Sequence, residues 1–175
     1  MRYRLIGAAG LVIGAVAIGP TAWERMRFRP LSPDAIADHL LVEKSSRTLS
    51  VMRDGIPLKS YRVALGRNVD GPKEFEGDGR TPEGHYVIDS RKPDSAFHRA
   101  LHISYPSIED EVNATLHGRS PGGAIMIHGL RNGLGLLGPA HRACDWTDGC
   151  VAVTNREIEE LWRVVPDGTP IEVRP

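Results

Sequence analysis

Two residues in the C-terminal third of the chain could act together as a nucleophile and a base. Cys150 follows directly after Gly149 and directly precedes the apolar run at residues 151–153. A glycine turn would present the thiol at a strand edge, with backbone N–H groups nearby to hold an oxyanion. Because free cysteine is often a small buried hydrophobic residue, this motif alone leaves both interpretations open.

His128 is the candidate base. It follows the apolar run at residues 124–127 and precedes Gly129, so its imidazole is expected where a buried strand opens onto a loop. A thiol with a pKa of about 8.5 is mostly protonated at neutral pH, and a neighbouring imidazole that takes its proton gives a thiolate–imidazolium pair. A histidine satisfied within the core is the alternative. Both motifs together favour the catalytic pair.

The second cysteine, Cys144, lies six positions before Cys150. A disulfide between them would close only a small loop and stabilise the fold little. A redox dithiol would favour a two-residue spacing, which is absent here. Cys144 is therefore interpreted as a bystander thiol.

Other polar residues are weaker candidates for substrate contacts. No metal and no cofactor is expected. The histidines outside the pair lack the close paired spacing of a zinc motif, and no cysteine pair completes one. Residues in the loop between base and nucleophile are interpreted first as solvated charge at each single position, and contact with substrate carboxylates is the alternative. These residues are Arg131, Asn132, His141 and Arg142. Trp146 and Trp162 are interpreted as packing residues.

The elements that must position these residues are mostly short strands. Asp54 and Gly55 form a two-residue hairpin signal between strands near residues 49–52 and 61–65. Further strands are predicted at 40–42, 85–89, 101–105, 124–127, the last buried on both faces, and 171–173. Residues 67–84 are rich in glycine and predict a long loop that borders a site. A single, mostly β, antiparallel sandwich-like domain is expected.

One or two peripheral helices complete this prediction. Pro106 and Ser107 begin a short helix to about Leu116. Thr154 and Glu157 form a capping box that opens a second helix, whose apolar residues recur at helical spacing and should pack on the sheet.

Composition and charge indicate one domain that is not directed at nucleic acid. The chain has 175 residues, with 22 basic and 22 acidic side chains. Residues 1–30 resemble a signal peptide or an N-terminal membrane anchor, because Arg2 and Arg4 precede an uncharged apolar run at 5–18. Residues 31–38 are predicted as a linker and 39–175 as the catalytic domain. Membrane anchoring would use residues 5–22.

Three ordered motifs resemble the L,D-transpeptidases of the YkuD fold. They are the glycine-rich string at residues 77–84, Ile125-Met126-Ile127-His128-Gly129, and Gly149-Cys150 before an apolar strand. The resemblance covers residues 39–174. It implies a cell-wall enzyme of the bacterial envelope, periplasmic, that is exported or anchored to the inner membrane.

The resemblance also implies roles for the motif residues. Cys150 would attack an L,D peptide bond of a peptidoglycan stem peptide, His128 would activate it, and the carbonyl of Gly129 would orient the imidazole. Gly149, Asp148, Arg131 and Asn132 would form the oxyanion and substrate-binding region.

One position departs from the family pattern. Many members have histidine where this chain has Asp148, so this carboxylate is expected to point away from the thiol, toward a donor or a cationic substrate group. The string from Asp145 to Asn155 looks like a subgroup that includes enzymes that detach a lipoprotein from peptidoglycan. Hydrolysis, with a wall-linked lipoprotein as partner, therefore competes with transfer. A catalytically silent wall-binding module should lack the nucleophile or the base, and this chain has both.

Overall fold

The structure is a computed structural model and describes residues 30–175. The predicted signal peptide or anchor, apart from Pro30, lies outside the described residues. Within residues 30–175, no helix combines the length and the apolar character that crossing a bilayer requires.

The domain is mostly β, as predicted, and is built on one sheet with the strand order β3-β2-β1-β8-β4-β5-β6-β7. Its strands are β1 (His39–Glu43), β2 (Thr48–Arg53), β3 (Ile56–Arg62), β4 (Gly84–Ser95), β5 (His98–Ile103), β6 (Met126–His128), β7 (Val151–Ala152) and β8 (Pro170–Arg174). Two pairings, β1 with β8 and β6 with β7, are parallel, so the sheet is mixed rather than wholly antiparallel. In both pairs a long connection joins the strands, which parallel pairing requires.

The meander from β1 to β3 has the predicted turn, but its third strand, expected near 61–65, ends at Arg62, because Ala64 pairs with Ala152 instead. Asp54 and Gly55 both have positive φ, 52° and 73°, as a type I′ hairpin turn requires. Alternate side chains of β1, Leu40 and Val42, are fully buried in the core. This alternation turns one face of the meander toward the interior.

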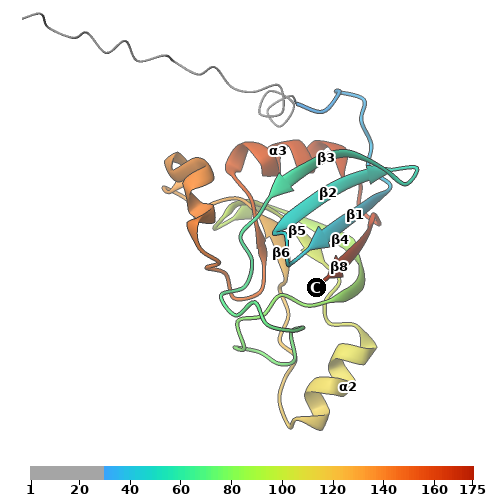
Figure 1. Cartoon of the computed structure of the whole chain (residues 1–175), viewed down its shortest axis with the longest axis vertical. Helices are drawn as coiled ribbons and strands as arrows, with labels where there is room; N and C mark the ends of the chain where they lie inside the picture. The colour runs from blue at the N-terminus through green and yellow to red at the C-terminus, as the bar shows by residue number, and fades with distance from the viewer. Residues whose placement is uncertain (1–29) are drawn as a thin grey trace, which may run out of the picture.

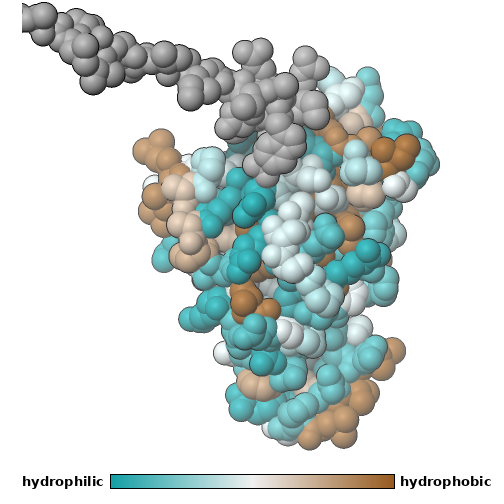
Figure 2. Space-filling view, in the orientation of Figure 1, coloured by the Kyte–Doolittle hydropathy of each residue, from teal (hydrophilic) through white to brown (hydrophobic). Residues whose placement is uncertain are grey.

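The helices lie on different parts of the domain. They are α2 (Ile108–Leu116), the 3-10 segment η1 (Gly135–Ala143) and α3 (Asn155–Val164). The predicted capping box of Thr154 and Glu157 is present at α3, and Ser107, predicted at the start of a helix, caps α2. Figure 1 shows α3 beside the sheet, whereas α2 stands at the opposite end of the molecule. Apolar surface gathers over both α2 and η1 in Figure 2.

The strand before His128 is shorter than predicted. β6 begins at Met126, because Ala124 has a φ of 55°, a left-handed conformation that interrupts a regular strand. Ala124 is also exposed and Met126 half-buried, so the prediction of a strand buried on both faces was wrong at these positions. The predicted long loop is confirmed: residues 67–83 hold no strand or helix.

Candidate active site

The candidate nucleophile directly precedes β7, and the candidate base ends β6, the neighbouring strand. In the parallel register of β6 and β7, His128 pairs with Ala152. Cys150 is two residues before Ala152, and side chains two residues apart on a strand share a face. The backbone N–H of Val153 donates to the His128 carbonyl at 2.9 Å and locks the two segments together.

The imidazole of His128 has one defined hydrogen bond. Its Nδ1–H donates to the carbonyl oxygen of Gly129 at 2.7 Å, which leaves Nε2 without a proton and free to act as a base. Burial lowers the pKa of His128, and the hydrogen bond to Gly129 opposes this effect only in part. The imidazole is therefore neutral at neutral pH, the form that can accept a proton.

Gly129 allows this arrangement because it has no side chain. A Cβ at this position would lie 2.8 Å from Oδ1 of Asn155 and 3.1 Å from Cβ of His98. The close approach of α3 thus requires a glycine after the base. Asn155 itself accepts a hydrogen bond from the backbone N–H of Leu130 at 2.8 Å, which fixes the chain beyond the base.

Aromatic rings surround His128. The ring of Phe97 lies 4.6 Å from the imidazole and that of Trp146 lies 5.7 Å away, measured between centroids. His141 packs edge-on against the far side of Trp146 at 6.3 Å. Trp146 is thus a packing residue, as predicted, and what it packs against is the candidate base. The sequence did not indicate that Phe97 contacts the base, because Phe97 lies in the turn between β4 and β5, 31 residues before His128.

The thiol of Cys150 is half-buried and lies 3.6 Å from the carbonyl oxygen of Ala124. Burial raises the pKa of this thiol, while a backbone hydrogen bond from Met126 and the charge of Lys73 lower it in part. Together with the lowered pKa of His128, this favours a neutral thiol beside a neutral imidazole. Desolvation of both groups therefore opposes the thiolate–imidazolium pair that the sequence predicts.

The turn before the nucleophile is tightly held. Gly149 has a φ of 126°, and a Cβ there would lie 2.5 Å from the carbonyl oxygen of Arg80. The hydroxyl of Thr147 donates to the Cys150 carbonyl at 2.7 Å and accepts from the Gly149 N–H at 3.2 Å. These contacts leave the backbone around the thiol little freedom.

Asp148 engages a cation. Its side chain is 76% exposed and forms an ion pair with Arg67, which is 63% exposed. The sequence expectation that this carboxylate meets a donor therefore agrees with the geometry. An exposed pair of this kind stabilises the fold little, so Asp148 can exchange partners with a substrate at low cost.

The loop between base and nucleophile does not present all its predicted substrate contacts. Arg131 is exposed. The side chain of Asn132 instead accepts from the His98 N–H at 3.0 Å and donates to the Ser95 carbonyl at 3.1 Å, so it braces the β4–β5 turn. His141 is only 8% exposed, and Arg142 pairs with Glu157. The interpretation of these two residues as solvated loop charge was therefore wrong. The reason is that this segment folds into η1 against Trp146 and α3.

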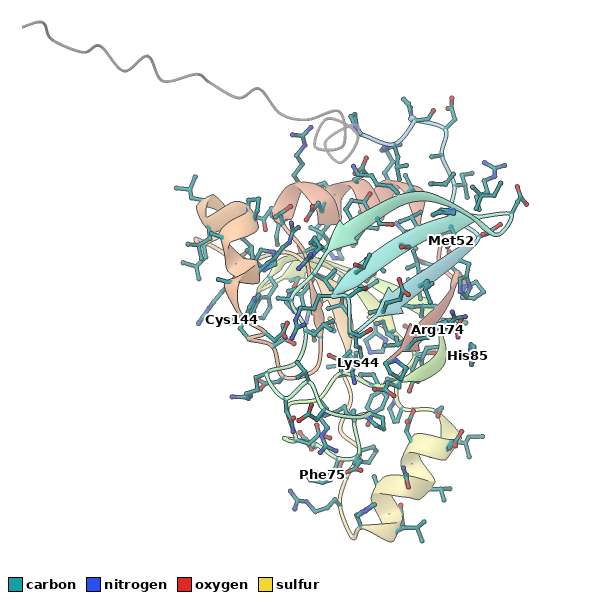
Figure 3. The ribbon with its side chains drawn as sticks, in the orientation of Figure 1. Lys44, Met52, Phe75, His85, Cys144 and Arg174 are labelled. Atoms are coloured by element: carbon teal, nitrogen blue, oxygen red, sulfur yellow. The ribbon has the colours of Figure 1, made fainter. Side chains whose placement is uncertain are left out.

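Both cysteines are free in the structure, with Cys144 exposed. Figure 3 labels Cys144 where the chain leaves η1. Among residues 30–175, no three or more His, Cys, Asp or Glu side chains cluster in a way that could hold a metal ion.

The fold and the paired motifs define a catalytic domain of a known class. The family model of YkuD, the L,D-transpeptidase catalytic domain, matches residues 37–173. The chain therefore belongs to the YkuD family of L,D-transpeptidase catalytic domains.

Individual relatives are more distant. YafK of Escherichia coli, named as a candidate L,D-transpeptidase, is 32% identical over 110 residues, which are 62% of this chain and 37% of that protein. YkuD of Bacillus licheniformis, named in the same way, is 24% identical over 147 residues, 82% of this chain and 70% of that protein. This chain thus spans little more than a third of the length of YafK.

Solved structures support the fold. The helical cell shape determining protein Pgp2 of Campylobacter jejuni superposes with a TM-score of 0.59 at 23% identity, over 85% of this chain and 52% of that one. Bd1075 of Bdellovibrio bacteriovorus gives a TM-score of 0.52 at 26% identity, over 82% of this chain and 52% of that one.

Proposed function

We propose that this protein is a peptidoglycan L,D-transpeptidase that works through an acyl-enzyme on Cys150. One observation carries the proposal. His128 is oriented by the Gly129 carbonyl, is neutral, and shares a sheet face with the thiol. Such a pair suits acyl transfer, in which a base must first take and later return a proton.

The first half-reaction breaks an L,D peptide bond of a donor stem peptide. As Sγ of Cys150 attacks the carbonyl carbon, Nε2 of His128 takes the thiol proton. The negative charge on the carbonyl oxygen is held by the backbone N–H of Cys150, because the Gly149 N–H already donates to the Thr147 hydroxyl. His128 then returns the proton to the leaving amine, so the terminal D-residue departs and a thioester remains.

The second half-reaction resolves the thioester. The amine of an acceptor stem peptide attacks the acyl carbon while His128 accepts its proton, and the thiol leaves and is reprotonated. The new bond cross-links two stems. Water in place of the amine would give hydrolysis, of a stem or of a wall-linked lipoprotein.

Substrate contacts would come from the charged groups at the rim. Asp148 is the partner we propose for the side-chain amine of a stem peptide, and Arg131 for a carboxylate, since both are exposed. A substrate of this kind places the enzyme in the bacterial envelope. A role in wall organisation is in keeping with the similarity to Pgp2, a protein that determines helical cell shape.

The decisive test uses the full-length chain and purified sacculi, with mass spectrometry of the released muropeptides. New cross-linked stems are expected with the unaltered protein and none with Cys150→Ala. Shortened stems or a freed lipoprotein, without new cross-links, would show that the protein is a hydrolase and not a transpeptidase. Products from Cys150→Ala equal to those of the unaltered protein would refute the nucleophile.

The base is tested separately by alkylation of the thiol with iodoacetamide. A Cys144→Ala background leaves Cys150 as the only thiol, because the chain has two cysteines. His128→Gln should slow alkylation and lower turnover by roughly 100-fold or more, the size usual for a general base. Equal alkylation rates with and without His128 would show that another group activates Cys150.

A further inference from the structure

Two buried lysines hold the glycine-rich segment at residues 66–84, which borders the candidate active site. Lys44 has a side chain 4% exposed and forms an ion pair with Glu83 at 2.6 Å. Lys73 has a side chain 3% exposed and pairs with Asp78, equally buried, at 2.8 Å. A charge buried to this degree is costly unless it is paired and hydrogen-bonded, so both pairs impose a conformation on the segment. Figure 3 labels Lys44, which follows β1, and Phe75, which belongs to the glycine-rich segment.

Asp78 is the centre of the second pair. Its Oδ1 accepts from Nζ of Lys73 and from the Arg80 N–H at 3.0 Å, and its Oδ2 accepts from the N–H groups of Glu74 and Phe75 at 2.7 and 3.2 Å. Burial alone would raise the pKa of Asp78, but Lys73 and these N–H groups lower it overall. The carboxylate thus stays ionised and ties four points of the loop to one position.

The loop held in this way lies against the Gly149–Cys150 turn. The carbonyl oxygen of Arg80 lies 2.5 Å from the position that a Cβ on Gly149 would take. The hydroxyl of the next residue, Thr81, accepts from the Gly66 N–H at 2.9 Å. Residues 79–81 therefore lie close against both Gly66 and Gly149. A shift of Arg80 toward Gly149 would disturb the turn, because the φ of 126° at Gly149 leaves few alternatives.

We propose that the buried Lys73–Asp78 pair is a positioning element of the active site, which sets the Gly149–Cys150 turn and supplies a fixed positive charge to the thiol. The inference rests on the proposed function, since it takes Cys150 as the nucleophile. Lys73 and Asp78 act through the backbone and the local field and do not touch the substrate.

Electrostatics give the second part of this role. The thiol is partly removed from water, which disfavours the thiolate, and a nearby cation offsets that effect. Lys73 is the charged residue that lowers the pKa of Cys150 against the effect of burial. Lys44 is buried to the same degree and pairs with Glu83 of the same segment, so it serves as a matched control.

The test measures the alkylation rate of Cys150 against pH in full-length Cys144→Ala protein. Lys73→Met should shift the alkylation profile to higher pH, because the cation that favours the thiolate is gone. Lys44→Met removes a buried lysine that pairs with the same segment and should leave the midpoint unchanged. If Lys73→Met does not fold, Lys73→Met with Asp78→Asn removes both charges together and should show the same shift.

Asp78→Asn alone separates position from charge. This variant keeps the Lys73 cation but weakens the hydrogen bonds that Asp78 accepts. Turnover on sacculi should therefore fall by about tenfold or more, while the pH profile of alkylation does not move to higher pH. Thermal melting identifies how much folded protein each sample contains, and rates are compared per folded molecule.

Two results would overturn the inference. Equal midpoints for the variants lacking Lys73 and for Lys44→Met would remove the electrostatic role, and full turnover in Asp78→Asn would remove the positioning role. The alkylation midpoints can be measured whether or not the protein acts on sacculi, whereas the turnover result requires the proposed function. If the unaltered protein yields no sacculus product, that function fails even where the alkylation profiles shift as expected.

Discussion

The two halves of the sheet are built differently. In the frame half, β1, β2, β3 and β8 pair over four to six residues each, and Leu40, Val42, Leu49 and Val51 are fully buried. In the site half, β6 has three residues and β7 two. There the backbone is held by close glycine contacts and by side chains such as Thr147 and Asp78. The comparison teaches that ladders and core supply stability, whereas loops locked by polar contacts supply the geometry for chemistry.

The largest effects are expected from two alanine variants, one in each half of the sheet. Cys150→Ala should abolish turnover and change the free energy of unfolding by less than about 1 kcal/mol, since the thiol is only half-buried. Leu49→Ala should cost about 2–5 kcal/mol through loss of buried surface and a cavity, yet keep turnover per folded molecule. Urea unfolding and the sacculus assay measure both. A stable, inactive Leu49→Ala protein would break the comparison.

A pair of glycine variants probes the backbone of each half. Gly149→Ala should lower turnover by about tenfold or more and destabilise the fold, because its φ is 126° and the new Cβ meets the Arg80 carbonyl at 2.5 Å. Gly55→Ala, with a φ of 73° and nothing within 4 Å, should cost only about 1 kcal/mol and no activity. Normal turnover in Gly149→Ala would show that the turn tolerates movement.

Acid should weaken the site half through His141. Burial, assisted by the charges of Arg142 and His128, lowers the pKa of His141 from 6.5 to about 4. Between these values the unfolded chain binds more protons, so stability falls as pH drops from 6.5 to 4, by up to about 3 kcal/mol. His141→Gln should flatten this slope in urea unfolding at several pH values. His128 leaves part of the slope, because its pKa is also lowered.

The smallest effect is expected at the rim. Asp148→Asn should raise KM for stem peptides more than it changes alkylation of Cys150, because its exposed pair with Arg67 contributes little to the fold. The free energy of unfolding should change by less than about 1 kcal/mol. An unchanged KM together with a strongly altered alkylation rate would instead assign Asp148 to the electrostatics of the thiol.

Local sequence predicted elements in both halves. The Asp54-Gly55 turn of the frame half and the capping box and apolar spacing of α3, which packs on β5 and β6, each depend on residues only a few positions apart. The β6 boundary was missed because Ala124 takes a positive φ that its residue type does not predict. The parallel place of β8 beside β1 depends on a connection across the sheet, which no local pattern encodes.

For the candidate site, the sequence by itself predicted the pair, from Cys150 after a glycine and His128 before Gly129, and the family resemblance implied the orienting carbonyl of Gly129. These motifs are local, because each joins residues adjacent in the chain. Only the tertiary structure decided the burial that shifts the pKa of each member of the pair, the packing of Phe97 and Trp146 on His128, and the close approach of Arg80 to Gly149. The physical reason is that desolvation and close contact depend on segments far apart in the chain, which meet only when the sheet has formed.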